Sequence, residues 1–180
     1  ALAADTGATL TGVSTGIIDV NGISTAEPFT LAGSGRTNFN GARNSLAALL
    51  NTSSTASTLS GAITLASATS VGSDYLNSVS GGTAGGNLTF SGIISGASNL
   101  LTKVGSNTLT LTGANTQGGL TITQGAVIVS GAAGQAGSGG NITISGGVTN
   151  GIIPANTLTF DNSAAALSTR AGAAANNRSI

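Results

Sequence analysis

Residues that could carry acid–base or metal chemistry are few in this chain and stand far apart. The five acidic residues are Asp5, Asp19, Glu27, Asp74 and Asp161, and histidine and cysteine are absent. Glycoside cleavage needs two carboxylates on one face, and zinc sites gather imidazole, thiolate or carboxylate ligands. Only Asp5 and Asp19 could meet on neighbouring turns of the chain. Serine has no histidine partner for a nucleophilic triad. We therefore predict a protein that is not an enzyme and holds no cofactor or metal.

The basic residues give no sign of an anionic partner. Lysine and arginine together number 5, which balances the acidic residues. Without a basic cluster, binding to nucleic acid or to an anionic membrane is not expected. Lys103 is predicted to lie in a turn, either as a solvated charge or as a cap on neighbouring carbonyl groups. The arginines are expected to pair with aspartates or backbone oxygens (Arg36, Arg43, Arg170 and Arg178).

One segment breaks the regular pattern of the chain and is the candidate interaction loop. Residues 74–87 (DYLNSVSGGTAGGN) are rich in glycine and contain the only tyrosine. We expect this loop to protrude from a regular body. Its candidate contacts for a glycan or another surface ligand are Asp74, Tyr75, Leu76 and Asn77.

The rest of the chain consists of short strand patterns separated by glycine and asparagine. Only 6% of the residues are charged and 39% are hydrophobic, while 29 are glycine. Apolar residues alternate with threonine or serine, which is typical of strands with one buried face. Phe90 and Phe160 lie inside such patterns and are expected in the core. The patterns cover residues 8–12, 17–22, 29–33, 58–61, 63–66, 70–73, 88–92, 109–112, 120–123, 127–130, 142–146 and 158–161.

Residues 45–50 (SLAALL) fit two interpretations. A one-turn helix suits their intrinsic propensity. A strand with Leu46, Ala48 and Leu50 facing inward suits the surrounding pattern, and we predict the strand.

A strand pattern repeated along one chain, with no helix between the copies, indicates a coiled stack of parallel strands. Each coil would take about 20 to 25 residues, and about eight coils would rise about 4.8 Å each. The predicted fold is therefore all-β, with one β-solenoid body over residues 1–180. Inward apolar residues would form a continuous column, and asparagines in the turns would form hydrogen-bonded ladders. No apolar run approaches the roughly 18 residues needed to span a bilayer.

Threonines at alternate positions predict an outward face. The threonines of 108–112 and of 121–123 point outward if the leucine and isoleucine residues between them point inward. Flat threonine arrays on β-solenoids can order water, as in ice-binding proteins. The alternative is that threonine simply suits the solvated side of a strand.

Residues 99–131 contain glycine, asparagine and lysine positions in a fixed order that resembles the autotransporter-associated β-strand repeat. The resemblance covers about residues 88–131. Asn107 departs from the family pattern, where glycine is usual, and so does Gln117, where an aromatic residue is usual. The residues that match the repeat are Lys103, Gly105, Gly113, Asn115, Gly118, Gly119 and Gly125.

The resemblance implies a right-handed parallel β-helix, export across the outer membrane of a Gram-negative-type bacterium, and display at the cell surface. It implies a scaffold rather than one activity. The expected function is that of a non-enzymatic extracellular structural protein, forming or belonging to a fibre, sheath or filament. An autotransporter passenger stalk acting as an adhesin is the alternative. An ice-binding solenoid is the minor alternative.

The two ends of the chain also suggest how copies would associate. Joining Ile180 to Ala1 continues the strand alternation, so the chain is interpreted as one period of a tandem array or as a fragment of a longer repetitive chain. Neither end has the polar cap that a solenoid needs to remain separate. End-to-end association would be heterologous and would give a filament. Self-association or tandem copies are therefore the expected partners.

Overall fold

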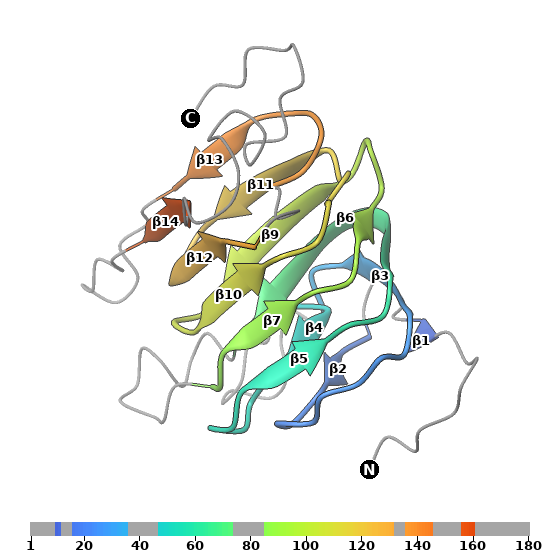
Figure 1. Cartoon of the computed structure of the whole chain (residues 1–180), viewed down its shortest axis with the longest axis vertical. Coiled ribbons are helices and arrows are strands. Elements are labelled where there is room, and N and C mark those ends of the chain that lie inside the picture. Colours follow the sequence, from blue (N-terminus) through green and yellow to red (C-terminus); the bar gives the residue numbers. More distant parts are fainter. Residues whose placement is uncertain are drawn as a thin grey trace.

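The computed structural model describes residues 10–11, 16–35, 47–73, 85–131, 136–145 and 156–160 (Figure 1). Within these ranges the regular elements are strands, and no helix is present. It follows that no helix in this part of the chain is long and apolar enough to cross a membrane. The candidate contacts Asp74, Tyr75, Leu76 and Asn77 lie outside the described residues, as do all the arginines.

The strands are short, and most of them coincide with an alternating pattern in the sequence. Their bounds are β1 (Leu10–Thr11), β2 (Ile18–Asp19), β3 (Phe29–Gly33), β4 (Leu49–Leu50), β5 (Ser57–Leu59), β6 (Ile63–Gly72), β7 (Leu88–Phe90), β8 (Ile94–Ser95), β9 (Leu100–Val104), β10 (Thr108–Leu111), β11 (Gly119–Ile122), β12 (Ala126–Val129), β13 (Ile142–Ile144) and β14 (Thr157–Phe160).

The strands pair in parallel and form two sheets. The larger sheet has the order β1-β3-β6-β9-β11-β13, with β4 and β8 also paired to β6 and β2 paired to β4. The smaller sheet has the order β14-β12-β10-β7-β5. From β9 onward the chain alternates between the sheets, so neighbouring strands of one sheet come from successive passes of the chain (Figure 1). The all-β prediction is confirmed, and the arrangement is consistent with a parallel β-solenoid.

Side chains of the smaller sheet stack in register. Leu109 of β10 pairs with Leu88 on one side and with Val127 on the other, and all three are fully buried. The next position, Thr110, pairs with Thr89 and is half-buried. Alternate residues of a strand face opposite sides. The predicted outward orientation of the threonines is therefore confirmed.

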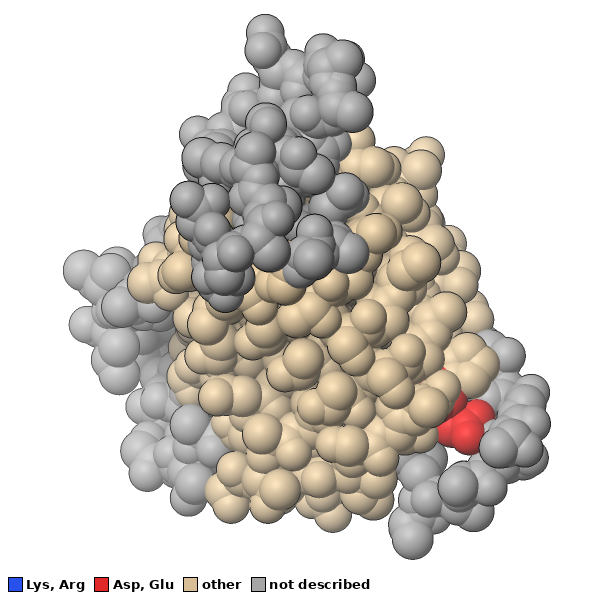
Figure 2. All heavy atoms as spheres, viewed as in Figure 1, with Lys and Arg blue, Asp and Glu red and all other residues tan. Residues whose placement is uncertain are grey.

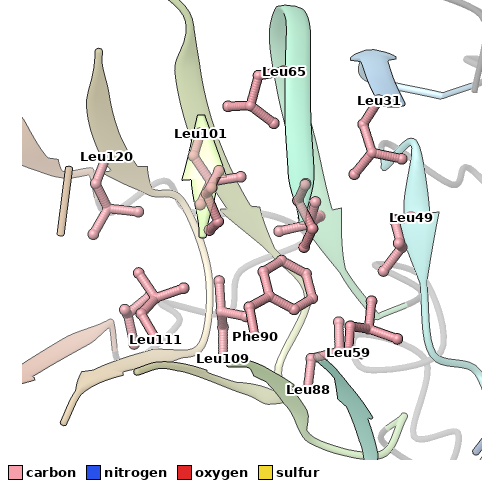
Figure 3. Packing of buried hydrophobic residues seen from close by; sticks show 14 of the residues in the cluster. Leu31, Leu49, Leu59, Leu65, Leu88, Phe90, Leu101, Leu109, Leu111 and Leu120 are labelled. Carbon is pink, nitrogen blue, oxygen red and sulfur yellow. The ribbon is translucent and has the colours of Figure 1, made fainter. Parts of the chain in front are cut away.

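The core lies between the two sheets. Figure 3 shows Leu65 and Leu101 of the larger sheet pointing toward Phe90 and Leu109 of the smaller one. Phe90 is fully buried, as predicted, whereas Phe160 is only partly buried and packs against the edge of the same cluster. Burying one such side chain contributes about 1.5 to 3 kcal/mol, so the column of them is the main stabilising feature of the stack.

The length of one pass of the chain varies. Thr123 Oγ1 donates to Lys103 O, 20 residues earlier, and Thr108 N donates to Asn87 Oδ1, 21 residues earlier. These separations agree with the expected coil length. Toward the N-terminus, Thr58 N donates to Ser24 Oγ across 34 residues. That longer pass contains residues 36–46, which interrupt the alternating pattern.

The segment around β4 is a strand, but its side chains face differently from the prediction. Ala48 and Leu49 are fully buried, and Leu49 belongs to the main core. Leu50 was predicted to face that core, and this was wrong: it joins Ala47 and Val104 in a second cluster. Leu46 lies outside the described residues. Because apolar residues fill every position here, the sequence has no alternation from which to read the inward face.

The sequence patterns did not predict β8 or β9. In β9 a lysine takes the position at which alternation would require an apolar residue. Lys103 pairs in register with Val71 of β6 and with Ile122 of β11. The predicted turn at Lys103 was therefore wrong, and the strand extends through it.

Candidate functional site

Lys103 is the most unusual side chain of the described structure. It is the only lysine of the chain, and none of its surface is exposed. Its register partners Val71 and Ile122 are also fully buried. The prediction of a solvated charge was therefore wrong, because β9 places this side chain on the buried side of the larger sheet.

The ammonium group of Lys103 is fully hydrogen-bonded. Lys103 Nζ donates to Val104 O at 2.8 Å, to Gly105 O at 2.7 Å and to Gln124 O at 3.3 Å. An ammonium group has three donors, and they bind carbonyls at the end of β9 and in the segments that follow β9 and β11. Lys103 is thus the carbonyl cap that the sequence offered as the other interpretation.

Burial changes the acid–base behaviour of this group. Removal from water disfavours the charged form of an amine and lowers the pKa of Lys103 from 10.5 to about 7. Such a pKa would suit a base or a nucleophile. However, Nζ is enclosed and all its donors bind the backbone, so the geometry supports a structural role for Lys103.

Lys103 and the segments 104–105 and 124–125 that bind its ammonium group are called the lysine turn here. Glycine suits residues 105 and 125 because each has a positive φ and little space for a Cβ. Their φ angles are +74° and +79°, in the left-handed region. A Cβ on Gly125 would lie 2.4 Å from Gly105 O and 2.9 Å from Lys103 Nζ. A Cβ on Gly105 would lie 2.3 Å from Ser73 Oγ of the preceding pass. The structure thus brings together three of the motif residues.

The other four motif residues hold successive passes of the chain together at other points. Asn115 is fully buried, and its Oδ1 accepts from Ile94 N at 2.9 Å. Asn115 N donates to Gly113 O at 2.9 Å. A Cβ on Gly113 would lie 2.4 Å from a backbone oxygen of the preceding pass, and one on Gly118 would lie 2.7 Å from another. Gly119 begins β11. These residues allow close backbone packing, and none of them points to a ligand.

Asn51 connects two successive passes of the chain, and the sequence patterns did not predict this role. It is fully buried, its Oδ1 accepts from Gly22 N at 2.9 Å, and its Nδ2 donates to Thr55 O at 2.8 Å. We expected asparagines in the turns to form hydrogen-bonded ladders with one another. The Asn51 amide instead binds the backbone of a neighbouring pass. No local signal distinguishes Asn51 from the exposed Asn21, because both stand in polar, turn-forming surroundings.

The two departures from the repeat pattern are also buried amides. Asn107 Nδ2 donates to Gly86 O at 2.8 Å, and Gln117 Nε2 donates to Ala136 O at 2.9 Å. Each bond joins neighbouring passes of the chain. The amide oxygens, Asn107 Oδ1 and Gln117 Oε1, are buried without a hydrogen-bond partner. These residues thus substitute a hydrogen bond for the packing expected of glycine or an aromatic ring.

The described acidic residues do not form a site. Asp19 Oδ1 accepts from Asn21 N at 3.0 Å and from Thr52 N at 3.1 Å, so its carboxylate holds a turn. Glu27 is 9% exposed, and its Oε2 has no hydrogen-bond partner. Within the described ranges, no group of three or more His, Cys, Asp or Glu residues could hold a metal ion. Asp5, the residue expected to meet Asp19, lies outside these ranges, as do Asp74 and Asp161.

No protein-family model, curated protein or solved structure matches this chain.

Proposed function

We propose that this chain is a non-enzymatic structural segment of a cell-surface fibre, sheath or filament, built as a right-handed parallel β-helix of about eight coils. The observation that carries the proposal is the in-register parallel stacking of both sheets around one apolar cluster. In such a stack each pass is hydrogen-bonded to its neighbours, so the body is stiff along the stacking direction. Extracellular display follows from the resemblance to the autotransporter repeat.

The described end of the stack at β13 and β14 supports association between copies. Within the described residues, β13 pairs only with β11 and β14 pairs only with β12. Ile144 is in register with the fully buried Ile122, yet Ile144 is 45% exposed. An apolar residue on the inward face of an unpaired edge strand is a template for one more layer.

Adding a further copy at this edge would continue the column of inward side chains. The contact would be heterologous, because the edge of one copy would meet a different edge of the next. Such contacts repeat without closing and generate filaments. End-to-end association or tandem copies within a longer chain would give the same rod.

Electron microscopy of the concentrated protein with two matched variants tests this proposal. Ile144→Lys places a charge on the apolar edge, where it opposes strand addition. Thr143→Lys places the same charge on the neighbouring exposed residue, which faces the other side of the sheet. The wild type and Thr143→Lys are expected to form long thin filaments, and Ile144→Lys only short particles.

Short isolated rods in all three proteins would contradict polymerisation through this edge. Binding of a glycan or surface protein by such rods would instead favour the adhesin stalk. Filaments of equal length in all three proteins would show that the edge at β13 is not the contact.

A further inference from the structure

The outer face of the smaller sheet carries a regular array of threonine and serine. Its central column contains Thr58, Thr89, Thr110, Ile128 and Thr159, one residue from each strand, all in register. Every member of the column is at least partly exposed. Isoleucine therefore interrupts an otherwise continuous line of threonines.

Two further columns flank this line. On one side lie Thr108 and Thr157, with Ala126 between them in register. On the other side lie residues that follow the strands, such as Ser91, Thr112 and Ser130, whose backbone N–H groups bond to the neighbouring strand of the smaller sheet. The backbone thus spaces the outward residues by about 4.8 Å between strands and by about 6.6 Å between alternate residues of a strand. Only the central column is threonine in four of its five positions.

The hydroxyl groups of the central column are free to bind something outside the protein. Thr58, Thr89, Thr110 and Thr159 make no side-chain hydrogen bond within the described part of the chain. Two hydroxyl groups outside this column are used internally: Thr123 Oγ1 donates to Lys103 O at 2.8 Å, and Ser138 Oγ donates to Thr116 O at 2.9 Å. The central column therefore presents unused hydroxyl groups at regular intervals.

The chemistry of the face excludes several kinds of ligand. The strands β5, β7, β10, β12 and β14 contain no charged residue. In the view of Figure 2 the described atoms are almost all uncharged. Anionic polymers would therefore find no counter-charge. Phe90 is fully buried and Phe160 packs against the core, so these strands offer no outward aromatic ring for a sugar to stack on.

We propose that this face binds ice, through a layer of water held in register by the threonine columns. Each threonine supplies one hydroxyl group, which donates and accepts hydrogen bonds, next to a methyl group that confines the neighbouring water. Bridging waters between fixed polar groups are nearly as favourable as direct hydrogen bonds. Hydroxyl groups at constant spacing therefore fix first-layer waters at constant spacing, and a crystal of water is the partner with that repeat. This inference does not depend on filament formation.

Ice-affinity partitioning and thermal hysteresis of the purified chain test the proposal with three variants. Thr110→Lys introduces a bulky charge at the centre of the array. Thr121→Lys introduces the same charge on an outward threonine of the larger sheet, in register with Thr102 and Thr143, and serves as the control for which face binds ice. Ile128→Thr fills the gap in the central column. Circular dichroism is used to check that each variant is folded.

The wild type is expected to partition into ice and to show thermal hysteresis, both retained in Thr121→Lys. Thr110→Lys is expected to lose most of the hysteresis, and Ile128→Thr to increase it. Failure of both the wild type and Ile128→Thr to enter ice would overturn the proposal. Equal losses in Thr110→Lys and Thr121→Lys would also overturn it, because the activity would not belong to this face. Lateral pairing of copies, abolished by Thr110→Lys without any ice activity, would instead identify the face as a contact between rods.

Discussion

Lys103→Met is predicted to remove a rise in stability that the wild type shows as the pH increases above neutrality. Burial lowers the pKa of Lys103 to about 7 in the folded protein, against 10.5 without burial. Below pH 7 the amine is charged in both the folded and the unfolded states, so stability does not depend on its titration. Between the two pKa values the unfolded state binds the additional proton, and the folded state therefore gains stability as the pH rises.

The size of this effect follows from the pKa difference. Each pH unit within the window changes the free energy of unfolding by about 1.4 kcal/mol. Over the whole window from about 7 to 10.5 the change is about 5 kcal/mol. At neutral pH the methionine variant loses three hydrogen bonds to carbonyls, at about 1 to 3 kcal/mol for each unsatisfied group, but it also loses the buried charge. The stability of the variant at a single pH is therefore less informative than the change of its free energy of unfolding with pH.

Urea denaturation followed by circular dichroism measures this slope. The midpoints for wild type and Lys103→Met are compared at intervals of about one unit across the window, which subtracts the titration of all other groups. The wild type should become progressively more stable relative to the variant as the pH rises. Parallel pH profiles for the two proteins would contradict this prediction, because they would show that Lys103 keeps an ordinary pKa in the fold.

Three further substitutions test the packing by chemical denaturation. Gly125→Ala is expected to destabilise the fold by more than about 1 kcal/mol, because its φ is +79° and a Cβ would lie 2.4 Å from Gly105 O; Gly139→Ala, with open space around it, should change little. Leu109→Ala should lower the free energy of unfolding by about 2 to 5 kcal/mol, and a loss no larger than that of outward Thr110→Ala would contradict the assigned core. Asn51→Ala removes three side-chain hydrogen bonds of a buried amide and should destabilise the fold by about 2 to 3 kcal/mol, again far more than Thr110→Ala.

Strand patterns with clean alternation were predictable from the sequence. In β10, Leu109 and Leu111 are separated by threonine, so both the strand and its inward face follow from a period of two. Around β4, residues 47–50 are apolar throughout, and the pattern cannot show which residue faces which cluster. Pairing partners were not predictable either, because every pattern resembles every other and the connecting segments differ in length.

The lysine turn shows why site geometry was harder to predict than the fold. A single lysine in a strand looks like a break in the pattern, because a charge on the buried face is normally unfavourable. The buried charge is compensated by backbone carbonyls, and one of them belongs to Gln124, 21 residues away. The buried amides of Asn51 and Asn107 pose the same problem, since their partners belong to another pass of the chain. Such contacts depend on register between layers, which one sequence does not specify.

The most direct test of a stacked structural rod is fibre diffraction or cryo-electron microscopy of the assembled protein. We expect filaments whose strands lie across the long axis, with a repeat of about 4.8 Å along it. Their cross-section should contain the two described sheets around one apolar column. Strands running along the filament axis, or assemblies without this repeat, would contradict it.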